Sequence, residues 1–249
     1  MTDTVCITGA TSGFGRAAAH AFAQQQWRLI LIGRREERLQ DLQAELGQQT
    51  QVQTIALDVR DTQACLSALE NLPPLKTLIN NAGLALGTAP AEQSSLEQWH
   101  TMIDTNNKGL VTVTKCLLPK LRDYGSGASI INIGSIAGFY PYPGGNVYCA
   151  TKAFVDQFSK ALRCDLGGSG IRVTNLAPGM AESEFTLVRT GGDQQAYDDL
   201  YRGVDAIQPK DIADTLLWLA QLPPHLNINT LEIMPVQQAW GPLAVHRNT

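Results

Sequence analysis

Seven short apolar runs rich in valine, isoleucine and leucine recur along the chain. Runs that are apolar throughout rather than alternating fit strands buried on both faces, as in a parallel sheet. The runs are Thr4–Ile7, Leu29–Ile32, Val52–Ala56, Thr77–Ile79, Ser129–Ile133, Arg172–Leu176 and Leu231–Met234.

Between the runs, apolar residues repeat with the period of an amphipathic helix. The clearest such segments are Glu36–Leu46, Thr62–Leu69, Met102–Leu121 and Val147–Leu166, and the last ends before Gly167-Gly168, a helix stop signal. Strand and helix therefore alternate from one end of the chain to the other. This order predicts an α/β Rossmann fold, a doubly wound parallel seven-stranded sheet with helices on both faces.

One region, about 178–208, is less regular than the rest. It begins with Pro178-Gly179, includes Gly191-Gly192, and ends where Pro209-Lys210-Asp211 predicts a helix start. An insertion at the carboxyl end of a strand is where a substrate lid is expected in such a sheet. We find no repeat or linker, so residues 1–249 are predicted to form one domain.

The composition narrows the class of protein. The 249 residues are 44% hydrophobic and 17% charged, as in a soluble globular domain with a sizeable core. The net charge of −4 includes no basic block, so neither nucleic acid nor a membrane surface is predicted as a partner. No apolar run reaches the roughly 18 residues of a membrane helix, and no signal peptide is evident, so we expect a cytoplasmic protein.

The five cysteines are widely spaced and form no Cys-x-x-Cys pair, and the four histidines are scattered. Neither a disulfide framework nor a metal site is predicted, and the cysteines are expected to be reduced thiols, mostly buried.

The stretch TGATSGFG, Thr8–Gly15, lies between the first predicted strand and a helix. Its glycines permit a tight turn and let backbone N–H groups at the helix start approach a pyrophosphate. The spacing differs from the Gly-x-Gly-x-x-Gly of the usual dinucleotide fingerprint, and alone it is also compatible with an ordinary turn. The expected cofactor contacts are Gly9, Thr11, Ser12, Gly13, Phe14 and Gly15.

The second predicted strand ends in Gly33-Arg34-Arg35, where NAD-binding proteins commonly place an acidic residue. Two guanidinium groups suit a 2′-phosphate, which predicts NADP(H) over NAD(H), although a solvated arginine pair is the alternative. Asp58-Val59 ends the third strand, where Asp58 can accept a hydrogen bond from the adenine amino group. Asn80–Gly83 ends the fourth strand and leaves room for adenosine. Further expected contacts are Arg34, Arg35, Asp58, Val59, Asn81, Ala82 and Gly83.

Tyr148 and Lys152 lie four residues apart at the start of a predicted helix and share one face, while Ser135 follows the fifth strand. A nearby ammonium lowers the pKa of a tyrosine from its ordinary value of about 10. A serine hydroxyl can hold a substrate oxygen beside it. The three residues form an acid–base set for carbonyl reduction by a nicotinamide, although a Tyr-x-x-x-Lys pair alone also arises by chance.

Together, these motifs resemble the short-chain dehydrogenase/reductase family of the classical type, over essentially the whole chain. The resemblance rests on Thr8–Gly15, Asp58, Asn80–Gly83, Asn106, Ser135, Tyr148, Lys152 and Pro178-Gly179. It implies that Tyr148 donates the proton, Lys152 also holds the nicotinamide ribose, and Ser135 orients the substrate. It further implies a proton-relay water at Asn106, cofactor contacts at Tyr148, Lys152, Pro178 and Gly179, and a homotetramer.

Longer stretches resemble two branches of this family. NNAGLALG and DTNNKGL resemble the NADP-dependent 3-hydroxy acid dehydrogenases, which oxidise serine-like acids and reduce malonic semialdehyde. PYPGGNVY and PGMAESEFTLVRTGGDQ resemble the sulfoacetaldehyde reductases, which make isethionate. We favour the second branch, with the hydroxy acid branch (serine or allo-threonine) as the alternative. A non-catalytic NADP(H) sensor is an alternative of another class, although such proteins often lose the tyrosine or the lysine.

Both branches need an anchor for the substrate anion. Arg189 in the lid is the best candidate because its fork suits carboxylate or sulfonate oxygens, and a surface salt bridge is the alternative. Tyr140 and Asn146 are expected to line the substrate pocket. The apolar stretch Pro235–Thr249, with Trp240, is expected to pack against another subunit. A neighbouring subunit's tail that reaches the active site is a further option.

Overall fold

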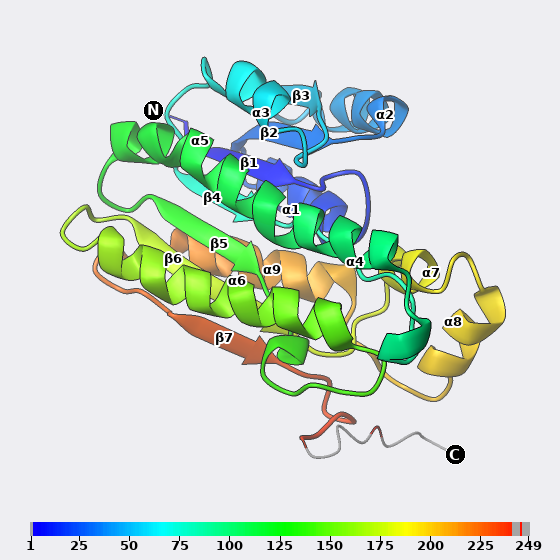
Figure 1. Ribbon diagram of the computed structural model, residues 1–249. Coiled ribbons are helices and arrows are strands. Elements are labelled where there is room, and N and C mark those ends of the chain that lie inside the picture. Colours follow the sequence, from blue (N-terminus) through cyan, green and yellow to red (C-terminus); the bar gives the residue numbers. More distant parts are fainter. Residues whose placement is uncertain (1, 241–244, 246–249) are drawn as a thin grey trace.

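The structure is a computed structural model that describes residues 2–240 and 245. At its centre lies a parallel seven-stranded sheet in the order β3-β2-β1-β4-β5-β6-β7 (Figure 1). The strands are β1 (Thr4–Thr8), β2 (Arg28–Gly33), β3 (Val52–Ala56), β4 (Thr77–Asn80), β5 (Ser129–Ile133), β6 (Arg172–Pro178) and β7 (Thr230–Ile233). The order reverses between β1 and β4, and open sheets of this kind bind ligands at that point. The predicted fold class is confirmed.

Helices cover both faces of the sheet. One face carries α1 (Gly13–Gln24), α2 (Glu36–Leu46) and α9 (Pro209–Gln221), and the other carries α3 (Thr62–Leu69), α5 (Leu110–Tyr124) and α6 (Asn146–Asp165). The strands supply apolar side chains to both layers, since Leu29 and Leu31 pack toward α1 whereas Ile30 and Ile32 pack toward α3 and α5. This two-sided burial explains why the inner strands are rich in apolar residues, whereas the edge strands β3 and β7 are only partly buried.

The predicted helix Met102–Leu121 differs from the structure. The chain forms α4 (Leu96–Ile103), a π-helical segment η2 (Asp104–Gly109) and then α5. Gly109 permits a close approach of Val59, because a Cβ there would lie 2.7 Å from Val59 Cγ2. Segments of π-helix are rare and occur frequently at functional sites.

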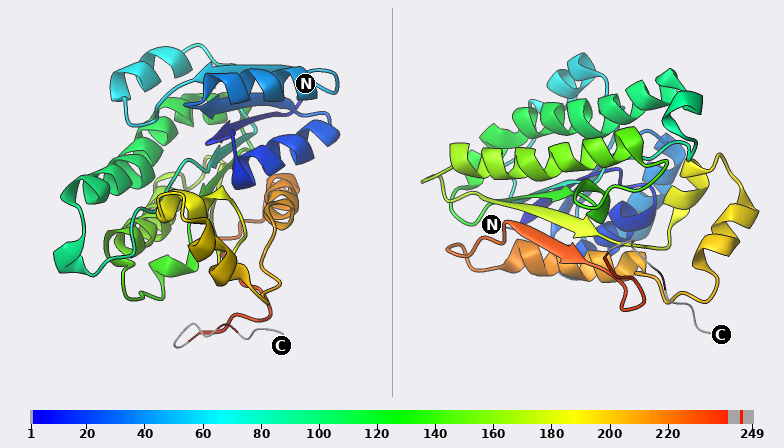
Figure 2. Two further views of the ribbon diagram at one scale, coloured as in Figure 1. Left: turned by 90° about the vertical axis from the view of Figure 1, so that its right-hand side faces the viewer. Right: turned by 60° about the horizontal axis from the view of Figure 1, so that its bottom comes forward.

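The carboxyl ends of the strands carry the predicted lid, which contains two short helices, α7 (Glu184–Arg189) and α8 (Gln194–Tyr201). Figure 2 (left) shows them in yellow in front of these strand ends. The short segments η1 (Ala91–Gln93) and η3 (Ile136–Gly138) follow β4 and β5.

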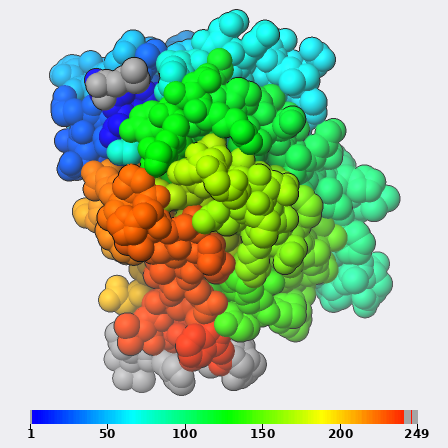
Figure 3. All heavy atoms as spheres, turned by 90° about the vertical axis from the view of Figure 1, so that its left-hand side faces the viewer, coloured from blue at the N-terminus to red at the C-terminus, as the bar shows by residue number. Residues whose placement is uncertain are grey.

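Residues 234–240, which follow β7, lie on the outside of the molecule, in red in Figure 3. Trp240 is 61% exposed there. The expected subunit-packing stretch 235–249 lies partly outside the described residues, which omit 241–244 and 246–249. None of the helices within residues 2–240 has the length and apolar character needed to cross a bilayer.

Candidate active site

The glycine turn after β1 is held by Asn81, at the end of β4. Asn81 Nδ2 donates to the carbonyl oxygens of Thr8 (2.9 Å) and Gly9 (3.1 Å). Gly9 has φ +66°, and a Cβ there would lie 2.9 Å from Asn81 Nδ2 and 3.0 Å from Ala82 Cα. A Cβ on Gly15 would collide with the Gly9 carbonyl. The glycines therefore allow the turn to pack directly on the β4 loop.

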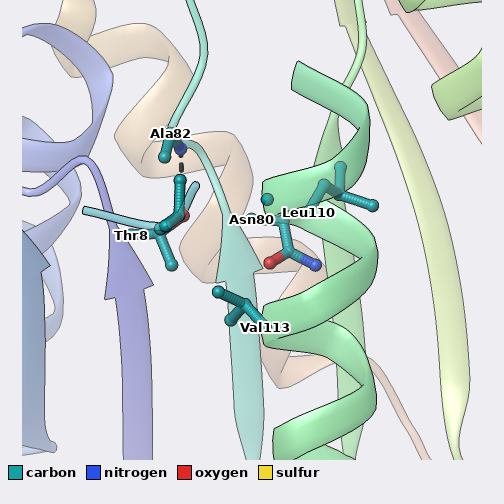
Figure 4. Close-up of a pocket in the computed structure, with 7 residues that line it drawn as sticks. Thr8, Asn80, Ala82, Leu110 and Val113 are labelled. Carbon is teal, nitrogen blue, oxygen red and sulfur yellow. Dashed lines mark hydrogen bonds between the residues drawn. The ribbon is translucent and has the colours of Figure 1, made fainter. Parts of the chain in front are cut away.

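Thr8 and Asn80 join the ends of β1 and β4 to the neighbouring elements. Thr8 Oγ1 accepts from the backbone N–H groups of Asn81 (3.0 Å) and Ala82 (2.9 Å), the latter drawn in Figure 4. Asn80 Nδ2 donates to Thr114 Oγ1 on α5 (2.9 Å). The gap that Figure 4 shows between these residues has no room for a water molecule, so it is a packing feature rather than a ligand site.

A cavity of about 630 Å³ opens along the carboxyl ends of the strands, a size typical of ligand sites. It brings together most of the residues singled out in the sequence. These are Gly9, Thr11, Ser12, Gly13, Phe14, Arg34, Arg35, Asp58, Val59, Asn81, Ala82, Gly83, Ser135, Tyr148, Lys152, Pro178, Gly179 and Arg189. Gly15 shapes the turn without lining the cavity.

Asp58 at the end of β3 is paired with Arg60. Arg60 Nη2 lies 2.6 Å from Asp58 Oδ2, and Arg60 Nε donates to both carboxylate oxygens at 3.0 Å. The Arg60 hydrogen bond outweighs burial and holds the pKa of Asp58 below its usual range. Asp58 is therefore an ionised carboxylate at the cavity wall, and each of its oxygens accepts two hydrogen bonds from Arg60.

Tyr148 and Lys152 lie on the buried face of α6, with 8% and 7% of their surfaces exposed. Lys152 Nζ donates to the Ile133 carbonyl at 2.7 Å and lies 5.8 Å from the Tyr148 ring centroid. Ser135 at the end of β5 accepts from Ala137 N (3.1 Å) and donates to Pro178 O (3.5 Å). The spacing read from the sequence thus brings three chemically complementary groups to one cavity.

Burial raises the pKa of Tyr148 well above its ordinary value, and the hydrogen bond from Ser135 and the charge of Arg189 only partly oppose it. Tyr148 is therefore a protonated phenol at neutral pH. The net shift of the Tyr148 pKa is upward, so the lowering expected from the sequence is not seen. Burial also lowers the pKa of Lys152 to about 8.

Asn106, in the π-helical segment η2, does not line the cavity. Its Nδ2 donates to Leu84 O (2.8 Å) and Thr151 Oγ1 (3.1 Å), and its Oδ1 accepts from Leu84 N (2.8 Å). Thr151 Oγ1 in turn donates to Tyr148 O at 2.8 Å, and Asn107 Nδ2 donates to Thr151 O at 3.0 Å. The amide of Asn106 thus joins the β4 loop to the helix that carries Tyr148 and Lys152.

Arg189, at the end of α7, lines the cavity and contacts Tyr142 through a hydrogen bond and a cation–π interaction. Its Nη1 donates to Tyr142 Oη at 2.9 Å, and its guanidinium lies 5.2 Å from the Tyr142 ring centroid. On the same helix, Phe185 packs against Tyr148 with 5.7 Å between ring centroids. The lid therefore brings one cation and one aromatic ring to the side of the cavity that holds Tyr148.

Tyr140 and Asn146 do not line the cavity, contrary to the expectation from the sequence. Tyr140 Oη donates to Glu232 on β7 (3.3 Å), and Asn146 Nδ2 donates to Ser94 Oγ (3.4 Å). The residue that lines the cavity in their place is Tyr142. The sequence shows two tyrosines in this loop but carries no signal for which one turns inward.

Thr105, also in η2, is a lining residue that sequence reasoning missed. Its side chain is 8% exposed, and its hydroxyl has no hydrogen-bond partner within the described residues. A buried polar group normally has a partner, so this unpaired hydroxyl is unusual among the described residues. No sequence signal identifies it, since the residue lies in a segment that looks like an ordinary helix.

The cavity fits a dinucleotide. Ser12 at the N-cap of α1 makes no side-chain capping bond within the described part of the chain, so first-turn N–H groups are free for phosphate oxygens. Arg34 lines the cavity with no side-chain hydrogen bond to any described residue, which leaves a cation for a further phosphate. The glycine turn and Arg34 would hold the phosphates, and Asp58 the adenine.

The fold and site are those of an NADP-dependent oxidoreductase. The profile of the family described as short chain dehydrogenase matches residues 3–191. The chain belongs to the short-chain dehydrogenase family.

Proteins similar to this chain divide between two activities. Sulfoacetaldehyde reductase 2 of Chromohalobacter salexigens is 59% identical over 252 residues that cover 100% of both chains. Serine 3-dehydrogenase of Rhizobium radiobacter is 52% identical over 253 residues, again covering 100% of both. A solved structure, the closed form of serine dehydrogenase complexed with NADP⁺, superposes with a TM-score of 0.91 at 48% identity and covers 98% of this chain and 100% of that chain. The cofactor of this protein is NADP(H).

Proposed function

We propose that the protein reduces a small anionic aldehyde with NADPH, with sulfoacetaldehyde as substrate and isethionate as product. The balanced reaction consumes one aldehyde, one NADPH and one proton, and it releases one alcohol and one NADP⁺. The 59% identity to sulfoacetaldehyde reductase 2 over the whole chain supports this substrate.

NADPH, when bound, supplies the hydride to the carbonyl carbon. The phenol of Tyr148 donates its proton to the carbonyl oxygen, and the hydroxyl of Ser135 holds that oxygen in place. Lys152 presents an ammonium beside them, where it would hold the nicotinamide ribose. Because burial keeps Tyr148 protonated, the site suits reduction at neutral pH.

The single observation that carries the substrate class is Arg189. Four basic residues among those described line the cavity, and two of them, Arg34 and Arg35, follow β2 at the cofactor end. Lys152 donates a hydrogen bond to the Ile133 carbonyl oxygen and lies beside Tyr148 at the reaction centre. Arg189 is left as the cation for the substrate, and its planar fork suits sulfonate or carboxylate oxygens.

A specificity experiment tests the proposal. Values of kcat/KM are measured with NADPH for sulfoacetaldehyde, malonic semialdehyde and succinic semialdehyde, and with NADP⁺ for isethionate and serine. A preference for sulfoacetaldehyde of tenfold or more, about 1.4 kcal/mol of transition-state discrimination, supports it. An equal or larger value for malonic semialdehyde would overturn the sulfonate assignment.

The second candidate is an NADP-dependent 3-hydroxy acid dehydrogenase that oxidises serine or allo-threonine, or reduces malonic semialdehyde. The 52% identity to serine 3-dehydrogenase of Rhizobium radiobacter favours it. One guanidinium can hold either acid group, so this candidate uses the same residues. The experiment above separates the two.

We further propose that the protein is a cytoplasmic homotetramer. Apolar side chains exposed at several surfaces, including Phe154 (42%), Trp218 (50%) and Trp240 (61%), support subunit contacts. Mass measurement in solution tests the assembly, and a monomer at micromolar concentration would contradict it.

A further inference from the structure

A carboxylate of the lid reaches the arginine-rich end of the cavity. Glu184, the first residue of α7, lies between two guanidinium groups. One belongs to Arg38 on α2, and the other to Arg35, the residue just before α2. Arg38 Nη1 is 3.1 Å from both Glu184 oxygens, and Arg35 Nη1 is 3.3 Å from Oε2. Although burial acts to raise the pKa of Glu184, the hydrogen bonds and charges of the two arginines hold it below its usual range.

Arg35 is also bound to the glycine turn. Its Nη2 donates to Ser12 Oγ (2.7 Å) and Thr11 Oγ1 (2.9 Å), and its Nε donates to Thr11 Oγ1 (3.1 Å). A guanidinium has five N–H donors, and four of those on Arg35 are thus directed at protein oxygens. A phosphate that binds Arg35 with both prongs of the fork must displace one of these acceptors.

Glu184 is the acceptor whose charge conflicts with a phosphate. Glu184, Arg35, Ser12 and Thr11 all line the cavity, so an incoming phosphate meets this group of side chains. The hydroxyls of Ser12 and Thr11 can rotate to donate to a phosphate, whereas a carboxylate can only accept. Two anions beside the same guanidinium groups repel each other.

We propose that Glu184 competes with the 2′-phosphate of NADP(H) for Arg35 and Arg38, and thereby limits the preference of the protein for NADP(H) over NAD(H). NAD(H) carries a hydroxyl at this position and has no charge to oppose, so the competition weakens the binding of NADP(H) alone. Arg38, which the sequence did not single out, does not itself line the cavity but contacts Glu184 at its edge, and in this proposal it becomes a third basic contact on the 2′-phosphate side.

The alternative for Glu184 is an ordinary surface ion pair. The side chains of Glu184, Arg35 and Arg38 are all close to half exposed, and such pairs contribute little to stability. An ion pair of this kind predicts no difference between ligands with and without a 2′-phosphate. This difference is therefore the quantity to measure.

The experiment titrates 2′,5′-ADP and 5′-AMP, fragments with and without the 2′-phosphate, into the full chain by calorimetry. In Glu184→Gln the affinity for 2′,5′-ADP should rise by about 3- to 10-fold at low salt, with the gain shrinking as salt screens the charges. The affinity for 5′-AMP should stay within about twofold of wild type. Arg38→Gln should weaken 2′,5′-ADP by a similar factor.

The matched control is Glu182→Gln. This variant removes the same charge two residues earlier, where the carboxylate accepts from Tyr197 Oη (3.0 Å) and Gln208 Nε2 (3.1 Å) rather than from an arginine. It should leave both affinities unchanged. Unchanged or weaker binding of 2′,5′-ADP by Glu184→Gln, an equal gain for both fragments, or an equal gain in the control would overturn the proposal.

The proposal rests on the NADP(H) site of the proposed function and not on the aldehyde. Neither fragment contains a nicotinamide, and no substrate is present in the titration. If sulfoacetaldehyde fails as a substrate while Glu184→Gln still binds 2′,5′-ADP more tightly, only the substrate assignment falls. If sulfoacetaldehyde is a substrate but Glu184→Gln does not bind 2′,5′-ADP more tightly, the proposed competition is refuted and the reductase assignment stands.

Discussion

Replacing Arg189 by methionine tests the anion anchor. The guanidinium is partly buried at the cavity wall, where its bonds to Tyr142 Oη (2.9 Å) and the Gly87 carbonyl (3.4 Å) hold it in place. Hydrogen bonds between charged partners contribute about 1.5–3 kcal/mol each. At about 1.4 kcal/mol per tenfold, Arg189→Met should lower kcat/KM for sulfoacetaldehyde by about 10- to 150-fold.

The assay compares sulfoacetaldehyde with propionaldehyde, a neutral aldehyde of similar length, by following NADPH absorbance. Propionaldehyde cannot use the anchor, so its kcat/KM should change by less than about threefold. Arg202→Met is the control, since Arg202 belongs to the same lid but pairs with Asp199 (2.6 Å) and is 70% exposed. Equal losses for the two aldehydes in Arg189→Met would refute the reasoning, because they would reveal a distorted lid rather than a lost anion contact.

Three further predictions concern the catalytic helix and the glycine turn. Because burial lowers the pKa of Lys152 to about 8 while that of Tyr148 is raised, kcat/KM for reduction should fall above pH 8 as the ammonium is lost. In Lys152→Arg, whose charge persists, the profile should stay flat, and an unchanged alkaline fall would assign it to another group. Thr151→Val removes the hydroxyl that accepts a hydrogen bond from Asn106 Nδ2, so it should lower the free energy of unfolding by about 1–3 kcal/mol and also lower kcat. Thr151→Ser keeps the hydroxyl and should restore both quantities. Identical behaviour of the Val and Ser variants would contradict this role. Gly15→Ala places a Cβ against the Gly9 carbonyl, so it should lower Tm by several degrees and weaken NADPH binding, and a raised Tm would show that the turn relaxes.

Much of the fold could be predicted because its signals are local. The seven apolar runs correspond to the seven strands of the sheet, since burial on both faces favours apolar residues in the inner strands, whereas the edge strands β3 and β7 are only partly buried. Tyr148 and Lys152 could be paired from the sequence because residues four apart share a helix face. The cluster around the cavity follows from topology, because all parallel strands end at the same edge of the sheet.

The sequence alone determined the α/β fold, the family resemblance and the preference for NADP(H), because these depend on periodicity and on residues adjacent along the chain. Only the tertiary structure decided that Tyr142 rather than Tyr140 lines the cavity, and that a π-helical segment interrupts the predicted helix 102–121. The pairing of Glu184 with Arg35 spans 149 positions and has no local signal. Such contacts depend on which surfaces the packed helices bring together, and that is a property of the whole core rather than of any one segment.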